Sequence, residues 1–481
     1  MRKSEATISD HLYLRVADGL EKMIDEDVLK IGDKLPSVRV LSDEYGISMG
    51  TAFQAYYHLE GKGLIEARPK SGYYVRFSQK RFPALPNIIQ PDPVSHDISV
   101  KEMIASIYAD IATHSNKVIN FAIGAPDPSL LPTAKINKSV MHALRNSKDS
   151  CTGYEHTQGN GELRKQIAKL AFNWGGKVKP DEVVVTGGCL EAMTLCIRAV
   201  TKPGDTVAVE SPNYFGIFQA LENMGLKVVE LSSSPVTGLD LDCLRKAIRN
   251  YPIRAVVAIP NFNNPLGGCM PDEHKKELVD IITKNNIPLV EDDIYGELYF
   301  GRNRPRTCKF YDTKGLVMHC SSLSKSLSPG YRIGWAIPGK FIEQVKMIKR
   351  IHNISSPTLT QAAMAHYLQH GRYEYHLKTM RKALHTQCLR YMQGIIDHFP
   401  PDTKVSRPHG GFILWVQLNR KVNTFRLRVE AMKHNISIVP GKIFSANCDY
   451  NHCIRISFGK PWDSDAEYGL TMLGKLIRKM L

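Results

Sequence analysis

The segment around Lys325 combines a lysine, small hydroxyl residues and a following arginine. Ser322 and Ser324 precede the lysine, and Arg332 follows it by seven positions. A lysine amine can form a Schiff base with an aldehyde, while serine hydroxyls and an arginine can hydrogen-bond and neutralise a phosphate. The segment therefore predicts a site for an aldehyde cofactor that carries a phosphate. Taken alone, it would also suit a solvent-exposed basic loop that is rich in serine.

Two motifs upstream of Lys325 supply groups that suit a cofactor ring. Asp292 lies at the end of a predicted strand, and Tyr295 follows it by three residues. A carboxylate at a strand tip and a tyrosine at that spacing can converge on opposite edges of one ring. Asn264 lies in an Asn-Pro-Leu-Gly sequence, which is typical of a turn. Each motif alone fits an ordinary surface or core position, but their order before Lys325 favours one shared site.

The order and spacing of these motifs resemble the class I and II aminotransferases of fold-type I, whose cofactor is pyridoxal 5′-phosphate. The resemblance covers roughly residues 115–481. It implies that Lys325 holds the cofactor and that Asp292 pairs with the protonated pyridine nitrogen, which makes these two the expected catalytic residues. It also implies that Tyr295 and Asn264 hydrogen-bond the phenolic oxygen of the cofactor.

The same resemblance assigns roles to residues farther upstream. Gly188 and Cys189 match the phosphate-cup positions at the start of a helix, where backbone N–H groups form an anion site. Leu190 departs from the family pattern, which often has a polar glutamine there, and this change weakens the expected cup. Tyr214 would stack on the ring of the cofactor, although a plain core tyrosine explains it equally well. Tyr154 would reach the phosphate of a neighbouring subunit.

Substrate recognition is implied at two further positions. Arg455 lies in a short β-branched run that resembles the family strand whose arginine binds a substrate carboxylate. The arginine fork suits that task because it pairs bidentately with a carboxylate, whereas a surface arginine on a strand is the simpler alternative. Gly124 lies in a loop, Asn120–Pro128, that resembles the loop of the family next to the substrate.

The order of apolar runs predicts an α/β architecture for most of the chain. Short β-branched runs alternate with longer helical patterns, which indicates a mainly parallel sheet. These runs are Val183–Thr186, Val207–Glu210, Ala255–Ile259, Pro288–Glu291 and Val317–Ser321. Beyond about residue 340 the chain is rich in helical patterns and then returns to strands near Gly411–Leu418 and Cys453–Phe458. We therefore expect a large α/β domain at about 120–340 and a smaller α+β domain mainly at 341–481.

The first 78 residues carry a different pattern of elements. Helical periodicity over 11–25 is followed by two shorter helices that begin after Ser37 and Ser48, and glycines end both. Two short strand-like runs then flank a Pro-Lys-Ser-Gly turn. This segment resembles the winged helix-turn-helix of the GntR family, a DNA-binding domain. The proline-containing stretch 79–96 is expected to be a linker, and residues 97–481 begin with a helical pattern over 103–111.

The GntR resemblance implies which residues contact DNA. They are Ser37, Arg39, Ser48, Thr51, Arg68 and Lys70. Arg39 could instead pair with a nearby carboxylate such as Glu44. One departure matters, because the family often has an arginine after the serine at position 48, where this chain has Met49 and Gly50. Base contacts at that point must be apolar or absent.

Charge and composition limit the function classes. The net charge is +16, yet the first 80 residues carry 12 basic and 12 acidic side chains, so the whole basic excess lies beyond them. Charge alone therefore does not identify a DNA-binding protein, although phosphates respond to local potential. The ten cysteines lie singly and without metal-ligand spacing, which is typical of reduced cytoplasmic thiols and predicts no metal site. We see no apolar run of membrane-spanning length.

Together the two parts resemble the MocR subfamily of GntR regulators. This implies a cytoplasmic homodimer that binds double-stranded operator DNA and a small amine or amino-acid effector. The effector would replace Lys325 on the cofactor, forming an external aldimine in place of the internal one, and so change how the DNA-binding domains are presented.

Two alternatives to this regulator stay open at the level of sequence. One is a catalytic aminotransferase with an accessory DNA-binding domain, because the sequence offers the residues for transamination, among them Lys325, Asp292 and Arg455. The other is a regulator whose degenerate pocket binds a metabolite without the cofactor. The sequence specifies neither the effector nor the operator.

Overall fold

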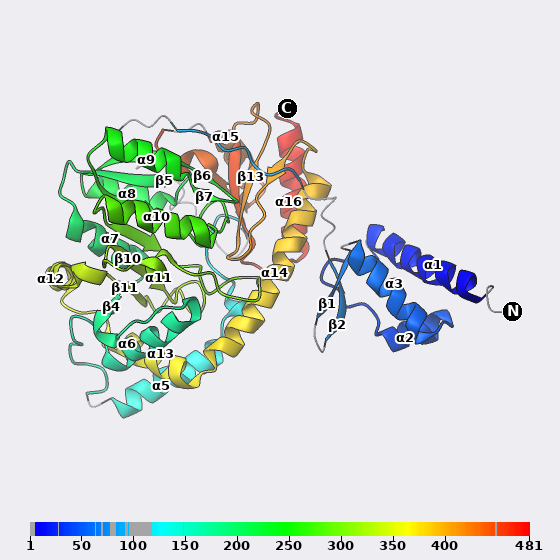
Figure 1. Cartoon of the computed structure of the whole chain (residues 1–481), viewed down its shortest axis with the longest axis horizontal. Helices are drawn as coiled ribbons and strands as arrows, with labels where there is room; N and C mark the ends of the chain where they lie inside the picture. The colour runs from blue at the N-terminus through cyan, green and yellow to red at the C-terminus, as the bar shows by residue number, and fades with distance from the viewer. Residues whose placement is uncertain are drawn as a thin grey trace.

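The computed structural model describes residues 5–26, 28–62, 64–68, 71–76, 83–91, 95, 118–147, 149–447 and 450–481. The N-terminal unit, called the head below, contains three helices and a hairpin in the predicted order, beside the much larger remainder of the chain, called the body (Figure 1). The elements of the head are α1 (Glu5–Asp25), α2 (Val38–Tyr45), α3 (Met49–Gly61), β1 (Ile65–Arg68) and β2 (Gly72–Val75). Lys70 and the helix expected over 103–111 lie outside the described residues.

Side-chain caps fix where the two short helices of the head begin. The Ser37 hydroxyl accepts a hydrogen bond from the Val40 amide at 3.2 Å, and the Ser48 hydroxyl accepts one from the Thr51 amide at 3.1 Å. Both bonds satisfy amides that the helices themselves leave without a partner. Gly46 ends α2 in the left-handed region, with φ 61°, where glycine carries no steric penalty. The predicted helix-turn-helix therefore forms from local signals.

The body is built on an eight-stranded sheet in the order β4-β11-β10-β9-β8-β5-β6-β7. Its strands are β4 (Val184–Thr186), β5 (Thr206–Ser211), β6 (Lys227–Ser234), β7 (Gly238–Leu239), β8 (Ile253–Ala258), β9 (Leu289–Asp292), β10 (Val317–Ser322) and β11 (Gly334–Ile337). The five strands from β10 to β6 run parallel, whereas β11 and β7 are antiparallel to their neighbours. The prediction of a mainly parallel sheet is confirmed.

Helices cover both faces of this sheet, which is why its strands are apolar on both sides. The side chains of β5 alternate between two core clusters: Val207 and Val209 pack with α7, α8 and α12, whereas Ala208 packs with α9, α10 and α11. The helices of this region are α5 (Thr133–Asn146), α6 (Gly161–Leu170), α7 (Cys189–Val200), α8 (Phe215–Asn223), α9 (Leu241–Asn250), α10 (Asp272–Lys284), α11 (Cys308–Tyr311), α12 (Ile342–Asn353) and α13 (Thr358–His370).

The C-terminal part forms the expected smaller α+β unit. Its sheet has the order β12-β13-β16-β15, with antiparallel neighbours throughout. Its elements are α14 (Tyr373–His398), β12 (Lys404–Val405), β13 (Ile413–Gln417), α15 (Thr424–Met432), β14 (Ile436–Ser437), β15 (Val439–Pro440), β16 (Cys453–Ser457) and α16 (Ser464–Arg478). The short strand β3 (Ile119–Asn120) pairs with β14, so the loop after β3 lies against this unit.

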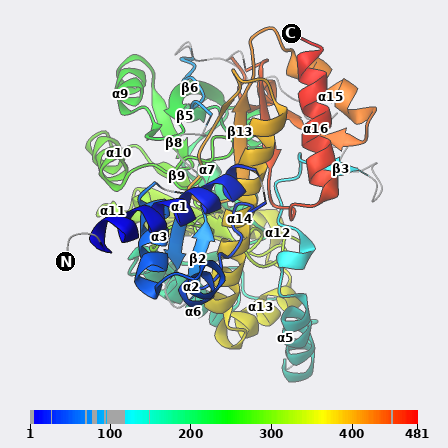
Figure 2. The same cartoon turned by 90° about the vertical axis from the view of Figure 1, so that its right-hand side faces the viewer.

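Two features of the fold decide what the chain can do. The parallel strands β9 and β10 end side by side, and the loops that leave their carboxyl ends carry Tyr295 and Lys325. Ligands of α/β sheets bind at this edge. The long helix α14 runs along the side of the body that faces the head (Figures 1 and 2). In the described part of the chain, no helix is both long and apolar enough to cross a membrane.

Candidate functional site

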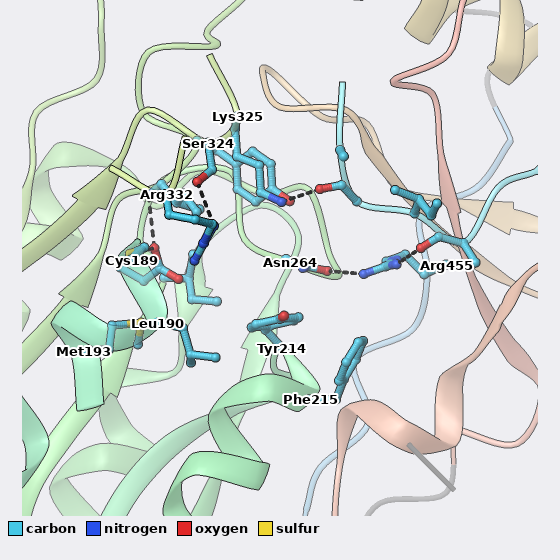
Figure 3. Close-up of a pocket in the computed structure, with 18 residues that line it drawn as sticks. Cys189, Leu190, Met193, Tyr214, Phe215, Asn264, Ser324, Lys325, Arg332 and Arg455 are labelled. Carbon is cyan, nitrogen blue, oxygen red and sulfur yellow. Dashed lines mark hydrogen bonds between the residues drawn. The ribbon is translucent and has the colours of Figure 1, made fainter. Parts of the chain in front are cut away.

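A cavity of about 370 Å³ opens at the carboxyl edge of the sheet, between the large and small units. Most of the predicted site residues meet there, as Figure 3 shows for those that it labels. The predicted residues that line the cavity are Gly124, Cys189, Tyr214, Asn264, Asp292, Tyr295, Ser324, Lys325, Arg332 and Arg455. They come from segments more than 300 positions apart in the sequence, so only the fold brings them together.

Lys325 extends into this cavity from the loop after β10. Its amine donates a hydrogen bond to the carbonyl oxygen of Gly124 and lies 5.9 Å from the centre of the Tyr295 ring. Burial, and then the nearby positive charge of Arg455, lower the pKa of Lys325 to about 8, while Asp292 opposes the shift. A lysine with this pKa has a much larger fraction of neutral amine near neutral pH than an ordinary lysine, and imine formation with an aldehyde requires the neutral amine.

Asp292, the last residue of β9, has one carboxylate oxygen held and the other available. Its Oδ1 accepts hydrogen bonds from the Cys189 thiol at 3.2 Å and from the Ile294 amide at 3.0 Å. Its Oδ2 has no hydrogen bond to any described residue. Burial raises the pKa of Asp292 to about 6, so the carboxylate gains from a cationic partner. A protonated ring nitrogen is such a partner.

The turn between β10 and β11 forms a cradle that fits a phosphate. Arg332, with φ 52°, lies so close to Gly188 that a β-carbon there would be 2.2 Å from Nη2 of the arginine, and only glycine leaves this space. Nη1 of Arg332 donates to the Ser324 hydroxyl at 3.3 Å. Cys189 begins α7 next to this cradle, so the first amides of the helix add positive potential. The cradle thus offers a guanidinium, a hydroxyl and helix amides to one anion.

Ser322 supports the cradle from behind and does not line the cavity. Its hydroxyl donates to the carbonyl oxygen of Ile333 at 2.8 Å and lies 2.7 Å from the hydroxyl of Ser324. Ser324 reaches the cavity whereas Ser322 does not, so the direct contact of Ser322 with phosphate stays a prediction. Gly188 likewise acts by leaving room for Arg332 and not by lining the cavity.

Arg455 reaches the cavity from β16 of the small unit. It is 3% exposed, and its guanidinium donates to the Asn264 side-chain oxygen at 3.3 Å and to the carbonyl oxygen of Ala122. A methyl group on Gly124 would lie 3.9 Å from this guanidinium, so the loop passes close to it. Arg455 therefore links both units around the cavity and suits the binding of a carboxylate.

Three predicted tyrosines have different surroundings. Tyr295 is buried, and burial raises the pKa of its phenol, which keeps it protonated as a hydrogen-bond donor. Tyr214 lies at the start of α8 and lines the cavity beside Phe215 (Figure 3). Tyr154 is 89% exposed and lies outside the cavity. A role for Tyr154 at a phosphate would therefore require a second copy of the chain.

The predicted DNA-contacting residues lie in three positions on the head. The hydroxyls at the two helix starts have partners within the head. Ser37 caps α2, and Ser48 caps α3 while its Oγ also lies 2.8 Å from Thr51 Oγ1. Arg39 is exposed in the first turn of α2 and has no acidic partner among the described residues, so the alternative pairing with Glu44 does not form.

The guanidinium of Arg68 in the hairpin already has partners within the head. It pairs with Glu66 at 2.7 Å, and its guanidinium carbon lies 4.1 Å from the centre of the Tyr74 ring. The carboxylate offsets part of its positive charge. Lys70, the other predicted contact on the hairpin, is outside the described residues. Among these basic residues, Arg39 is therefore the best placed for a phosphate contact.

Both parts of the chain match known families. Residues 116–471 match the aminotransferase class I and II family, and residues 12–75 match the bacterial regulatory proteins of the gntR family. The HTH-type transcriptional regulator YdcR of Escherichia coli is 36% identical over 98% of this chain and 99% of its own length. A second regulator of that organism, YjiR, is 35% identical over 98% of this chain and 99% of its own length. The chain belongs to the MocR-like regulators of the GntR family.

Solved structures resemble the body of this MocR-like regulator. LysN, an α-aminoadipate aminotransferase of Thermus thermophilus complexed with N-(5′-phosphopyridoxyl)-L-leucine, superposes with a TM-score of 0.72 and 26% identity, covering 78% of this chain and 94% of LysN. The kynurenine aminotransferase of Pyrococcus horikoshii, in complex with PMP, gives 0.73 and 25%, covering 80% and 96%. With the fit of Lys325, Asp292 and Arg332, these likenesses identify pyridoxal 5′-phosphate as the cofactor. When bound, it supplies an aldehyde for imine formation and an electron-withdrawing ring.

Sequence reasoning missed the residues that hold the lysine loop of the MocR-like regulator from behind. The Tyr373 hydroxyl lies 2.7 Å from the Ser326 hydroxyl, and the His376 ring donates to the Ser326 carbonyl oxygen at 2.7 Å. Both residues belong to the first turn of α14 and lie about 50 positions after Ser326. No motif marks them, because a tyrosine and a histidine on an amphipathic helix look like ordinary core residues.

Proposed function

We propose that this MocR-like regulator senses an amine, most simply an amino acid, at Lys325 and converts its binding into a change of DNA affinity. The observation that carries the proposal is that α14 contacts the lysine loop at one end and the head farther along. When bound, pyridoxal 5′-phosphate would supply one aldehyde carbon for imine formation, so an effector amine would compete with the amine of Lys325 for it. Arg455 is available for a carboxylate on the effector.

The first turn of α14 is hydrogen-bonded to the loop that carries Lys325. Tyr373 and His376 both hold Ser326, the residue next to the lysine. A Lys325 amine that is not bonded to the cofactor would be free to donate to the carbonyl oxygen of Gly124, the partner that it has in the structure. We expect this movement to shift Ser326, and the hydrogen bonds of its hydroxyl and its carbonyl oxygen would pass the shift to α14.

The middle and far turns of α14 hold the head. The Lys382 amine lies 5.4 Å from the centre of the Tyr74 ring in the hairpin, a cation–π contact. The Arg390 guanidinium lies 3.6 Å from the Asp33 carboxylate in the loop before α2. Along the helix axis, Arg390 is about 21 Å from His376, since each residue adds about 1.5 Å. One rigid element therefore touches both sites.

A homodimer fits this function. Tyr154 and Ile354 are both exposed, and the loops that carry them meet through a hydrogen bond from the Thr358 hydroxyl to the Gly153 carbonyl oxygen at 2.8 Å. A second copy would cover this apolar surface and place Tyr154 near a phosphate site. We further propose that the protein acts in the cytoplasm, where its DNA is found.

The decisive experiment follows the cofactor and the DNA in one sample. The full-length holoprotein first enriches a binding duplex from a random-sequence pool, which we call the selected duplex. Amines and amino acids are then titrated while the absorption of the cofactor and the affinity for the selected duplex are measured. An effector should shift the spectrum and change DNA affinity by about fivefold or more, the usual scale of coupling between two sites.

Variants on α14 separate coupling from binding. Lys382→Ala and Arg390→Ala should leave the spectral titration unchanged but reduce the effector-induced change in DNA affinity. Lys378→Ala, an exposed lysine on the same helix without a described contact to the head, is the matched control and should behave like the wild type. An effector that shifts the spectrum without altering DNA affinity would contradict the proposal. Sustained transamination with a keto acid would instead favour the enzyme alternative.

A further inference from the structure

The outward side of α3 carries three large apolar side chains in one row. Met49, Phe53 and Tyr57 are 55%, 52% and 70% exposed, and they follow each other at intervals of four residues. Residues four apart lie above one another on a helix, so the three form a continuous surface, called the α3 row below. The adjoining side of the same helix, with Ala52 and Tyr56, is fully buried in the core of the head.

Polar groups are nearly absent from this side of α3. No residue from Ser48 to Tyr57 carries a charge. The hydroxyls of Ser48 and Thr51 bond to each other and to the start of the helix, so they are engaged within the head. Gln54 is the exposed side chain with an amide on this surface. A partner that meets the α3 row therefore has to offer apolar groups.

Another surface of the head, the side of the hairpin that carries Tyr74, is already occupied. The hairpin of β1 and β2 lies between α3 and α14 in Figure 1, and Tyr74 of this hairpin contacts Lys382. The second helix of a helix-turn-helix enters the major groove, with its first residues at the base edges. Arg39 on the neighbouring helix is exposed and has no acidic partner in the described part of the chain, which suits a flanking phosphate. Geometry and charge thus favour duplex DNA as the occupant.

We propose that Met49 and Phe53 recognise thymine by packing against its methyl group in the major groove, an inference that rests on the DNA-binding role proposed above. The thymine C5-methyl is the one apolar group that the four ordinary bases present there. Tyr57 lies about 12 Å farther along the helix axis than Met49, away from the first residues of the helix, which meet the base edges. There its hydroxyl can donate to the sugar–phosphate backbone.

The test removes single methyl groups from the DNA. In the selected duplex, each thymine is replaced in turn by deoxyuridine, which keeps the Watson–Crick pairing and the acceptor oxygen. We expect the affinity of the full-length holoprotein to fall about fourfold at each contacted thymine, the value for one buried apolar carbon. At thymines outside the groove contact the exchange should have no effect. Where a contacted thymine is exchanged for cytosine, methylation of that cytosine at C5 should restore part of the affinity.

Protein variants assign the methyl contacts to side chains. Met49→Ala should abolish the difference in affinity between thymine and deoxyuridine at one position of the DNA segment that each head contacts. Phe53→Ala should abolish it at another position. Neither change should alter the salt dependence, because no phosphate contact is lost. Arg39→Ala is the matched control, since it should weaken both duplexes equally. Both apolar side chains are exposed, so circular dichroism should show an intact fold.

The outcomes distinguish this inference from the proposed function. If the holoprotein enriches no duplex from the pool, both fail. If it binds the selected duplex tightly but no deoxyuridine exchange changes the affinity, methyl recognition is wrong and DNA binding stands. If Met49→Ala and Phe53→Ala leave DNA affinity unchanged but convert a dimer into a monomer, the α3 row is an interface between two copies of the chain and the inference is overturned.

Discussion

The cofactor cavity and the α3 row of the head differ in which of their features match their families. In the cavity, the reactive side chains Lys325, Asp292 and Arg455 occupy the expected places, and the departures affect neighbours such as Leu190. In the head, the scaffold is ordinary, with both helices capped and the core closed, but its outward side chains are unusual. Buried chemistry leaves few geometric solutions, whereas an exposed surface is free to change its partner.

The two regions also differ in how they use charge. Three cations, Lys325, Arg332 and Arg455, line the cavity with one carboxylate, Asp292. This concentrated positive charge in a partly enclosed space suits a phosphate and a carboxylate. The first 80 residues have equal numbers of basic and acidic side chains. The head therefore depends on individual contacts, and its DNA affinity should depend weakly on salt for a DNA-binding domain.

Replacing Lys325 with alanine should have the largest effect and should affect one region only. Without the amine, no imine to the protein can form, so the absorption band of the internal imine should disappear completely from the holoprotein. The one described hydrogen bond of this side chain is to Gly124, so the fold should persist. DNA affinity in the absence of effector should stay within about twofold of the wild type. Spectroscopy and binding to the selected duplex measure both.

The response of Lys325→Ala to amines tests whether the cavity and the head are coupled. In Lys325→Ala, no amine should alter DNA affinity, because there is no lysine to release. An unchanged response to amines would mean that the effector acts outside this cavity. Loss of DNA binding without effector would mean that the two regions are not separable.

Much of the cofactor site was predictable because its signals are local. The residue types and the spacing around Lys325, Asp292 and Arg332 specify chemistry, and short apolar runs specify the strands whose ends carry them. The strand β11 was not predicted, since Gly334–Ile337 follows the cofactor loop directly. The surroundings of Ser322 were not predictable, because sequence order does not reveal that its hydroxyl faces the Ile333 carbonyl oxygen.

The contacts between regions were not predictable. Lys382 and Arg390 on α14 reach Tyr74 and Asp33 across more than 300 positions of sequence. A lysine or arginine on an exposed helix face has no signature that separates solvent contact from docking. Only the packing of the head against α14 assigns them a role.

The second prediction concerns pH and should give an effect of about tenfold. The pKa of Lys325 is lowered to about 8 by burial and by Arg455, so its neutral fraction rises about tenfold between pH 7 and pH 9. The rate at which the apoprotein takes up pyridoxal 5′-phosphate should rise by the same factor, as stopped-flow absorption can measure. DNA affinity should not follow this titration.

A substitution of Arg455 tests the cause of that pKa. Arg455→Met removes a positive charge, so the pKa of Lys325 should rise and the midpoint of the loading curve should move to higher pH. An unchanged midpoint would assign the low pKa to burial alone.

The smallest effect is expected for Arg39→Ala, the counterpart of the cavity variants in the head. Arg39 is exposed and has no acidic partner within the described ranges, so its loss should remove one phosphate contact worth ~1 kcal/mol, or about fivefold in affinity. The slope of log affinity against log salt should fall by about one, equally for all duplex sequences. The spectrum and the loading rate should match the wild type. A loss that depended on the base sequence would instead place Arg39 at a base edge, and the division between a polar α2 contact and an apolar α3 row would have to be redrawn.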